Sequence, residues 1–224
     1  MSATTTPTEA LAEALKNGVD LIGQIRITPL PQDDGSTHYR LTHLDDEGKS
    51  LESLEKHTSP RAAREIGLYG PDGHYRFTKG ELSLKSGWLF ELTSLEELRL
   101  TLDHFYPTSV ALWNAHKNGT IRVQNLRDKL DRQTGMYRHA RNVSDAGAQE
   151  LIRTLCGPSN QCVKKILWQI DENTPLEPSE ASEFPGYLPE ADPKKTIPLV
   201  CQEACNFFVA AARKKSKAEF EAKP

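Results

Sequence analysis

The chain has 224 residues, of which 37% are hydrophobic and 26% are charged, and its formal net charge is −3. This slightly acidic balance gives no support for a protein that binds nucleic acid through bulk positive charge. No apolar run approaches the length needed to span a membrane, so we expect a soluble globular protein with neither nucleic acid nor membrane as a partner.

The N-terminal segment carries the signals of a helix. Thr6 and Glu9 have the spacing of a capping box, and Pro7 suits the first helical position. Gly18 can end the helix, because glycine readily adopts the backbone conformation that often follows one. We therefore predict that residues 1–19 form an N-terminal helix and tail.

A β-hairpin followed by helices is predicted for the residues that come next. Residues 21–30 and 37–44 flank a polar turn that contains glycine, as the strands of a hairpin do. Thr93 and Glu96 have the spacing of a second capping box. The helices predicted after the hairpin cover residues 59–66, 93–105, 109–116, 126–132, 144–155 and 198–212. This succession predicts an α+β fold, with an N-terminal hairpin and small sheet, several helices and a cysteine-rich C-terminal part.

One main domain is predicted over residues 20–213. Within it, residues 171–192 are rich in proline and acidic side chains, which is typical of an extended surface loop. The last residues, 214–224, are mostly charged, and we expect them to form a flexible tail.

All four cysteines lie in the last third of the chain, as the close pairs Cys156 with Cys162 and Cys201 with Cys205. Two such pairs, joined by a long connection, can surround a soft metal centre with four thiolates. The spacers are wider than the two-residue spacer typical of structural zinc, whereas an iron–sulfur cluster tolerates wide spacing. Inert buried thiols and disulfides are the alternatives. Because no apolar signal segment follows Met1, we expect a cytoplasmic, reducing location, which disfavours disulfides.

The two cysteine pairs are predicted to lie in different local structures. Cys156 falls at the end of a helix, and Cys162 precedes an extended run. Pro198 suits the first turn of another helix. Cys201 and Cys205 are four residues apart, so they would share one face near the N-terminus of that helix, where free N–H groups favour thiolates.

A basic stretch precedes the cysteines. Arg132, Arg138 and Arg141 are its candidate anion-binding residues, because guanidinium groups match the carboxylates of a tetrapyrrole or an acidic partner. The alternative is a solvated surface whose arginines pair with the aspartates nearby in sequence. The histidines are scattered, and the chain has no hydrolase or nucleotide-binding motif.

Several segments together resemble a known family, in which they recur in the same order. These segments are Ser59–Ile66, Gly73–Arg76, Gly87–Trp88, Arg132–Tyr137, Gln161–Trp168 and Pro198–Asn206. They resemble the 4Fe–4S cluster domain found fused behind CbiX-type cobaltochelatase modules, which metallate precursors of cobalamin or sirohaem. The resemblance covers roughly residues 20–213. It implies that the four cysteines are the ligands of one 4Fe–4S cluster, with the cysteine site in residues 144–213.

The resemblance also implies a role. We expect an iron–sulfur protein that transfers electrons, or acts as an accessory or stabilising protein, beside a separate chelatase or redox protein in cobalamin biosynthesis. The chain is too short to hold the chelatase modules and has no chelatase histidine pair, so we expect no catalytic activity of its own. A zinc-stabilised binding module and a tetrapyrrole-binding metal-dependent enzyme are the two alternatives.

Residues close in sequence to the cysteines are candidates for tuning such a cluster. Four thiolates leave a typical cluster with about two negative charges, which cations can offset. Arg153, Lys164 and Lys165 are the candidate cations. Trp168 and Phe208 are candidates for an apolar shell that limits access of solvent, or they are core residues only.

Overall fold

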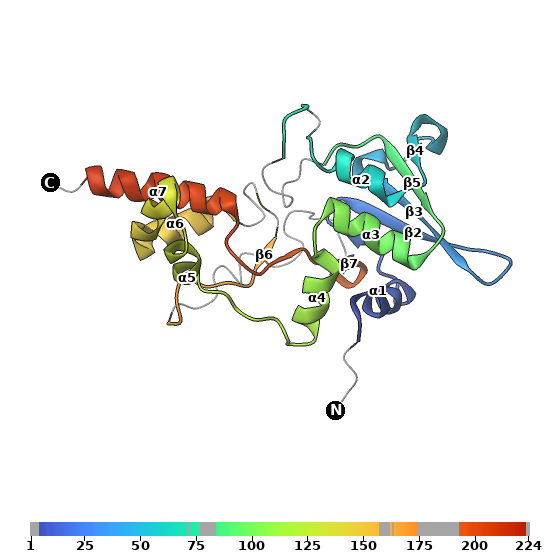
Figure 1. Cartoon of the computed structure of the whole chain (residues 1–224). Helices are drawn as coiled ribbons and strands as arrows, with labels where there is room; N and C mark the ends of the chain where they lie inside the picture. The colour runs from blue at the N-terminus through green and yellow to red at the C-terminus, as the bar shows by residue number, and fades with distance from the viewer. Residues whose placement is uncertain are drawn as a thin grey trace. The chain divides into compact units, whose positions relative to one another are not determined.

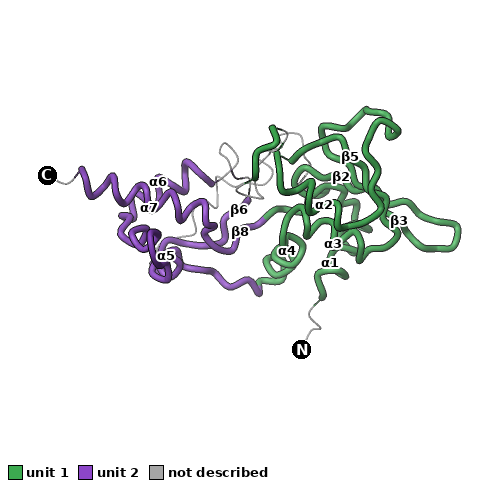
Figure 2. The backbone as a smooth tube through the Cα atoms, turned by 45° about the horizontal axis from the view of Figure 1, so that its top comes forward, with its two compact units in different colours: residues 1–119, 190–199 green, residues 120–189, 200–224 purple. Residues whose placement is uncertain are grey.

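The structure is a computed structural model that describes residues 5–70, 72–76, 84–156, 162, 164–173 and 193–222. The chain forms two compact units, shown in Figure 2. Unit 1 comprises Met1–Gly119 and Glu190–Leu199, and unit 2 comprises Thr120–Pro189 and Val200–Pro224. The boundary near residue 119 falls inside the range 20–213, where the sequence analysis placed no boundary.

Unit 1 combines helices with a mixed sheet of six strands, which confirms the predicted α+β fold. Its strands are β1 (Leu21–Ile22), β2 (Ile25–Pro31), β3 (Thr37–His43), β4 (Glu55–His57), β5 (Trp88–Leu92) and β7 (Thr196–Ile197). Its α-helices are α1 (Pro7–Lys16), α2 (Pro60–Ile66), α3 (Leu95–Phe105) and α4 (Ser109–Lys117). Short 3-10 turns are η1 (Leu44–Asp46), η2 (Leu51–Ser53) and η4 (Pro193–Lys195).

The sheet of unit 1 has the strand order β4-β5-β3-β2-β1-β7. Strands β2 and β3 form the predicted antiparallel hairpin, and β5 adds to it antiparallel to β3. Both edge strands, β4 and β7, run parallel to their neighbours, and β7 comes from a segment far along the chain. Helix α3 packs on β3 and β5, with α1, α2 and α4 beside it (Figure 1).

Local capping signals explain where the first helices begin. In α1 the capping box is present as predicted: the Thr6 hydroxyl accepts from Glu9 N, and the Glu9 carboxylate accepts from Thr6 N. In α3 the predicted box is wrong by one residue, because Ser94 is the N-cap and accepts from Glu97 N. The Glu96 carboxylate accepts from Arg99 instead.

An aromatic cluster forms the centre of the unit 1 core. The Trp88 and Phe105 rings are stacked, with centroids 4.8 Å apart, and Phe90 meets both rings edge to face. All three side chains are almost completely buried. Because edge-to-face and offset-stacked pairs suit the quadrupoles of aromatic rings, this cluster fixes how α3 lies on β5.

A close contact at the end of β1 requires glycine. Gly23 has φ +54°, and a Cβ atom added there would lie 2.6 Å from the Cζ atom of Tyr106. The Tyr106 hydroxyl accepts a hydrogen bond of 2.9 Å from Gln24 N. Burial raises the pKa of Tyr106 to about 12, so the hydroxyl stays protonated.

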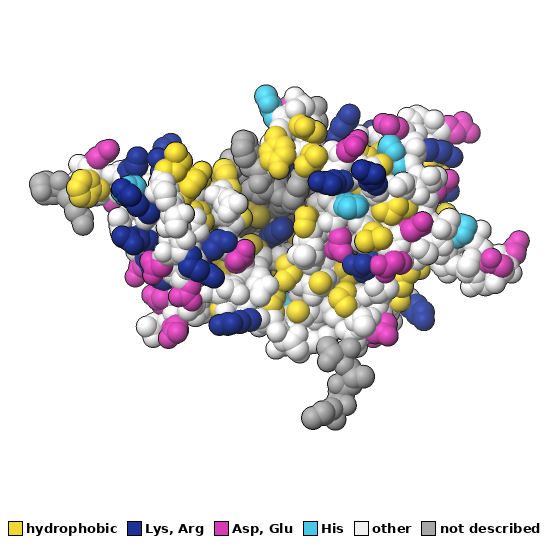
Figure 3. All heavy atoms as spheres, viewed as in Figure 1, with side chains coloured by type: hydrophobic (Ala, Val, Ile, Leu, Met, Phe, Trp, Pro, Cys, Tyr) yellow, Lys and Arg dark blue, Asp and Glu magenta, His cyan; other side chains and the backbone are white. Residues whose placement is uncertain are grey.

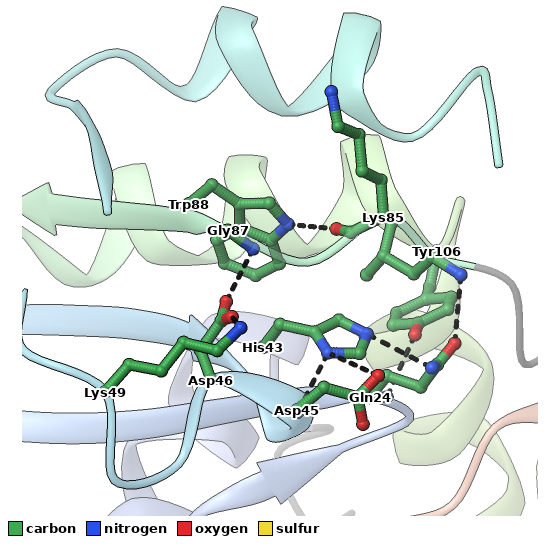
Figure 4. Close-up of polar contacts among 10 residues, drawn as sticks. Gln24, His43, Asp45, Asp46, Lys49, Lys85, Gly87, Trp88 and Tyr106 are labelled. Atoms are coloured by element: carbon green, nitrogen blue, oxygen red, sulfur yellow. Dashed lines mark hydrogen bonds and ion pairs between the residues drawn. The ribbon is translucent and has the colours of Figure 1, made fainter. Parts of the chain in front are cut away.

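A buried polar network lies beside this contact (Figure 4). The amide of Gln24 accepts from Leu84 N and lies 3.1 Å from Nε2 of His43, whose Nδ1 accepts from Asp45 N. His43 is 1% exposed, and burial lowers the pKa of its imidazole. The carboxylate of the next residue, Asp46, accepts a hydrogen bond from Gly87 N. The network therefore ties the chain that leads into β5 to the end of the hairpin.

Unit 2 is mainly helical. Its elements are α5 (Leu126–Asp131), η3 (Gly135–Asn142), α6 (Asp145–Leu155), β6 (Lys165–Ile166), β8 (Val200–Cys201) and α7 (Asn206–Glu221). The residues of its core come from these elements and the segments between them: Leu126, Leu130, Ala140, Val143, Ala148, Ile152, Ile166, Trp168, Ile170, Ala204, Phe208, Val209 and Ala212. Helix α7 packs against both η3 and α6.

Two helices of unit 2 are joined at one end through Ser144 and Glu219. Ser144 is the predicted N-cap of α6, and its hydroxyl accepts from Gly147 N. The backbone N–H and the hydroxyl of Ser144 both donate to the Glu219 carboxylate, at 2.9 and 2.7 Å. Glu219 belongs to α7, which continues through Glu221 into the segment 214–224 that was predicted as a charged tail.

Two further observations bear on the predictions. No helix in the part of the chain that the structure describes is long and apolar enough to cross a membrane. The acidic, proline-rich segment 171–192 lies outside the described residues, apart from its first three positions, 171–173.

Candidate metal centre

The four cysteines come from separate places in unit 2, and none of the four forms a disulfide. Cys156 is the C-cap of α6, and its backbone N–H donates to Ile152 O. Cys201 is the last residue of β8, and Cys205 is the N-cap of α7. Cys162 lies between α6 and β6, with its side chain partly buried. Two helix ends and one strand end thus carry three of the thiols.

The helix predicted from Pro198 is wrong, and this changes the setting of Cys201. Residues Val200 and Cys201 pair in parallel with β6, where Ile166 is the strand partner of Cys201. The backbone N–H of Leu167 donates to Cys201 O at 2.8 Å. Because this pairing holds the backbone extended, Cys201 and Cys205 do not share a helical turn.

Cys205 keeps the environment predicted for it. It stands at the N-cap of α7, a helix of 16 residues, and its side chain makes no capping hydrogen bond. Free N–H groups and the positive end of the helix dipole favour an anionic sulfur at this position. The sulfur of Cys205 is therefore available to a ligand in a place that stabilises thiolate.

The four sulfurs lie near enough to one another for their charges to interact. Burial is the main cause that raises the pKa of the Cys156 thiol, and the other three cysteines raise it further. Adjacent thiolates repel one another, so burial and the neighbouring sulfurs favour the protonated form of Cys156. A positively charged iron group would displace this proton on binding, which is the usual coupling for thiolate sites.

Two of the residues predicted to tune the cluster lower the pKa of the Cys201 thiol. Burial raises the pKa of its thiol to about 11, while the Lys164 ammonium and the Trp168 side chain lower it. Trp168 is 1% exposed, and its ring meets that of Phe208 edge to face with centroids 5.2 Å apart. The indole Nε1 is buried and has no hydrogen-bond partner among the described residues.

The other predicted residues are more dispersed. Arg153 is exposed in the last turn of α6, and Lys165 pairs with Val200 in the β6–β8 ladder. Arg132, Arg138 and Arg141 are all exposed. Arg132 Nε donates to the backbone carbonyl of Asp128 in the same turn, which is a local contact and not the alternative ion pair with an aspartate carboxylate.

The surface and pockets of unit 2 do not single out these arginines. In Figure 3 the Lys and Arg side chains over the helices of unit 2 are interspersed with acidic ones. A cavity of about 780 Å³ opens between η3 and the C-terminal part of α7, and the described residues that line it include none of the three arginines. Two of the residues that line this cavity are His139 and Lys217.

Sequence reasoning missed the contacts that hold the connection between Cys201 and Cys205. Gln202 Nε2 donates to Arg122 O at 3.1 Å. Glu203 forms an ion pair of 3.3 Å with Lys129 of α5. These partners are 80 and 74 residues apart in the sequence, so no local spacing marks them.

The donor set fits an iron–sulfur cluster in its chemistry, because four thiols are the ligands that such clusters take. Among the described residues, no three His, Cys, Asp or Glu side chains lie close enough together to hold a single metal ion.

Residues 118–214 match the family model of a 4Fe–4S iron–sulfur cluster binding domain, and all four cysteines fall inside the match. The family predicted from the sequence is thus confirmed.

The remainder of the chain matches a second family. Residues 7–117 match the DR2241 stabilising domain. The junction between the two matches lies within a few residues of the boundary between units 1 and 2. The match to the stabilising domain lies within unit 1. The match to the cluster binding domain covers most of unit 2 and also includes residues 190–199 of unit 1.

One solved structure shares the fold over most of the chain. It is DR2241 from Deinococcus radiodurans, described as a multi-domain protein with structural similarity to chelatases and with two additional novel domains. The TM-score is 0.70 and the sequence identity is 24%, over 94% of this chain and 42% of that protein. The chain therefore spans less than half the length of DR2241. A search of curated proteins gives no match.

Proposed function

We propose that unit 2 binds one 4Fe–4S cluster, with one thiolate each from Cys156, Cys162, Cys201 and Cys205. The observation that carries this proposal is the position of all four cysteines inside the match to a 4Fe–4S cluster binding domain. These are all the cysteines of the chain, and none of them forms a disulfide. Four soft sulfur donors supply the full ligand set of such a cluster.

The surroundings supply part of the charge that the cluster needs. Four thiolates give a typical cluster a net charge of about −2. The Lys164 ammonium acts on Cys201, and the N-terminus of α7 acts on Cys205. The two together offset part of the negative charge of the cluster.

We place this cluster in a protein that works with a chelatase-type partner. DR2241, which has structural similarity to chelatases, shares its fold with this chain over 42% of its own length. The role we propose for the chain is accessory: the cluster stabilises unit 2 and can accept one electron, while a separate protein inserts metal into a tetrapyrrole. Cobalamin or sirohaem precursors are the tetrapyrroles in this proposal, and the chain itself is not assigned catalysis.

Metal analysis of anaerobically purified protein tests the cluster. We expect a brown protein with four irons and four sulfides per chain, the composition of the cluster. Cys201→Ser and Cys205→Ser should each lose iron and sulfide. A colourless wild-type protein that holds zinc and no sulfide would replace the cluster with a zinc-stabilised binding module. Full iron content in Cys201→Ser would overturn the ligand assignment.

A further inference from the structure

The turn between Cys201 and Cys205 is fixed at both of its ends. Cys201 ends β8, which pairs with β6, and Cys205 is the N-cap of α7. Ala204, just before Cys205, is 2% exposed and belongs to the core of unit 2. Gln202 and Glu203 lie nearer the surface. Their side chains are therefore the ones that can hold the middle of the turn.

One hydrogen bond inside the turn depends on the thiol proton of Cys201. This thiol donates to Glu203 O, and Sγ lies 3.1 Å from the oxygen. A cysteine that ligates iron does so as a thiolate and has no proton to donate, so this bond is lost when a cluster binds. The middle of the turn must then be held by contacts that do not involve the sulfur.

Two side-chain contacts meet this requirement. The Lys129 ammonium of α5 lies 3.3 Å from the Glu203 carboxylate. Gln202 Nε2 donates to Arg122 O at 3.1 Å, in the segment that leads into α5. Neither contact uses a cysteine, so both can persist when all four thiolates ligate a cluster.

The α5 side of these contacts is itself held in place. Gln169 N donates to Gln124 O at 3.0 Å, and Leu126 N donates to Gln169 O at 2.7 Å. Gln169 lies in the segment that follows β6, and β6 is the strand that pairs with Cys201. The turn and the residues that hold it are therefore joined through the same part of unit 2.

We propose that Lys129 is a positioning residue: its ion pair with Glu203 holds the turn between Cys201 and Cys205 and thereby slows the loss of iron from the bound cluster. This inference rests on the proposed function. Cys205 is exposed, whereas the other three cysteines are partly buried. A chelator in solution reaches an exposed ligand most readily, so movement of this turn controls the first step of iron loss.

The test measures how fast the anaerobic holoprotein loses its cluster to excess EDTA, from the fading of its visible absorption. Lys129→Met removes the charge and keeps a long side chain. We expect loss to be about fivefold faster than in the wild type, which corresponds to about 1 kcal/mol. Added salt should speed the loss more in the wild type than in Lys129→Met, because salt screens an ion pair.

Reversal of the two charges tests whether the pair itself is responsible. Lys129→Glu alone places two carboxylates together, so its cluster should be lost faster than that of Lys129→Met. Adding Glu203→Lys to Lys129→Glu restores an ion pair and should bring the rate back toward that of the wild type. A double variant that loses its cluster as fast as Lys129→Glu overturns the inference.

Lys215→Met is the matched control. Lys215 pairs with Glu150 at 2.6 Å, and the two side chains are 27% and 53% exposed, against 21% and 56% for Lys129 and Glu203. Its removal leaves the turn untouched, and α6 and α7 stay joined through Ser144. We expect the wild-type rate of loss. A wild-type rate in Lys129→Met overturns the inference, and so does an equal acceleration in Lys215→Met.

Iron and sulfide analysis of each purified protein separates the two possible failures. If the wild type contains no iron and no sulfide, the proposed function has failed. If the wild type and Lys129→Met hold equal iron and sulfide and lose them at the same rate, only the role of Lys129 has failed, and the cluster assignment stands. If Lys129→Met assembles no cluster, the double variant decides: a cluster there supports the inference, and none there overturns it.

Discussion

Replacement of Gly23 by alanine should destabilise unit 1 far more than the same replacement at Gly35. Both glycines have positive φ, +54° and +84° respectively. A non-glycine residue in this region of backbone space costs about 1–2 kcal/mol. At Gly35 the added methyl meets nothing within 4 Å, so this backbone cost is the whole effect.

At Gly23 the methyl meets the Tyr106 ring as well. The new Cβ would lie 2.6 Å from both the Cζ and the hydroxyl oxygen, and 2.7 Å from Cε2. Forcing such an overlap in a packed core costs about 1–3 kcal/mol. Displacement of the ring also weakens the bond from Gln24 N to the hydroxyl, worth about 1 kcal/mol. We expect a total loss of about 3–6 kcal/mol.

Denaturant unfolding followed by circular dichroism measures the difference. The midpoint should fall much further in Gly23→Ala than in Gly35→Ala, with similar dependence on denaturant in both. In a Tyr106→Leu background, where the ring atoms nearest to the new Cβ are absent, Gly23→Ala should cost no more than Gly35→Ala does. Equal losses for the two glycine variants in the wild-type background would refute the steric reasoning.

Three further predictions concern the two units. Cys201→Ser should lower the melting temperature of unit 2 as well as its iron content, because metal-binding free energy is folding free energy when one cluster joins distant ligands; an unchanged melting temperature would contradict this. Arg138→Ala should weaken the binding of sirohydrochlorin in a salt-dependent way, with Arg61→Ala, a change at an exposed arginine of unit 1, as the control. Equal affinities of wild type and Arg138→Ala would show that Arg138 is a solvated surface residue. Because burial lowers the pKa of His43, the unfolded chain binds a proton on this side chain more readily than the folded chain does. In thermal melts the contribution of His43 to stability should be complete above about pH 6.5 and should be lost as the pH falls toward the pKa of the folded state. His43→Gln should remove this pH dependence.

The features that the sequence predicted correctly depend on neighbouring residues. The capping box of Thr6 and Glu9, and the cap at Ser144, each use partners three residues apart. The position of Cys156 at the end of α6 follows from the same helix. Such contacts form whatever the rest of the chain does, so their spacing is a reliable guide.

The features that were missed depend on partners distant in sequence. Pro198 suits the first turn of a helix, but Cys201 pairs with Ile166 of β6 and is therefore in a strand. Strand β7 joins the sheet beside β1, about 170 residues earlier in the chain, and no local pattern announces this pairing. Likewise, the orphaned N–H of Trp168 becomes visible only when the burial of its ring is known.

The link between Ser144 and Glu219 has a practical consequence for how the protein is handled. Helix α6 carries Cys156 at its far end, and α7 begins at Cys205, so each helix joins a thiol to this shared contact. The contact between Ser144 and Glu219 therefore holds α6 and α7 together at the ends opposite Cys156 and Cys205. A chain shortened before Glu219 would lose this contact, and the distance between the two sulfurs would be less well fixed.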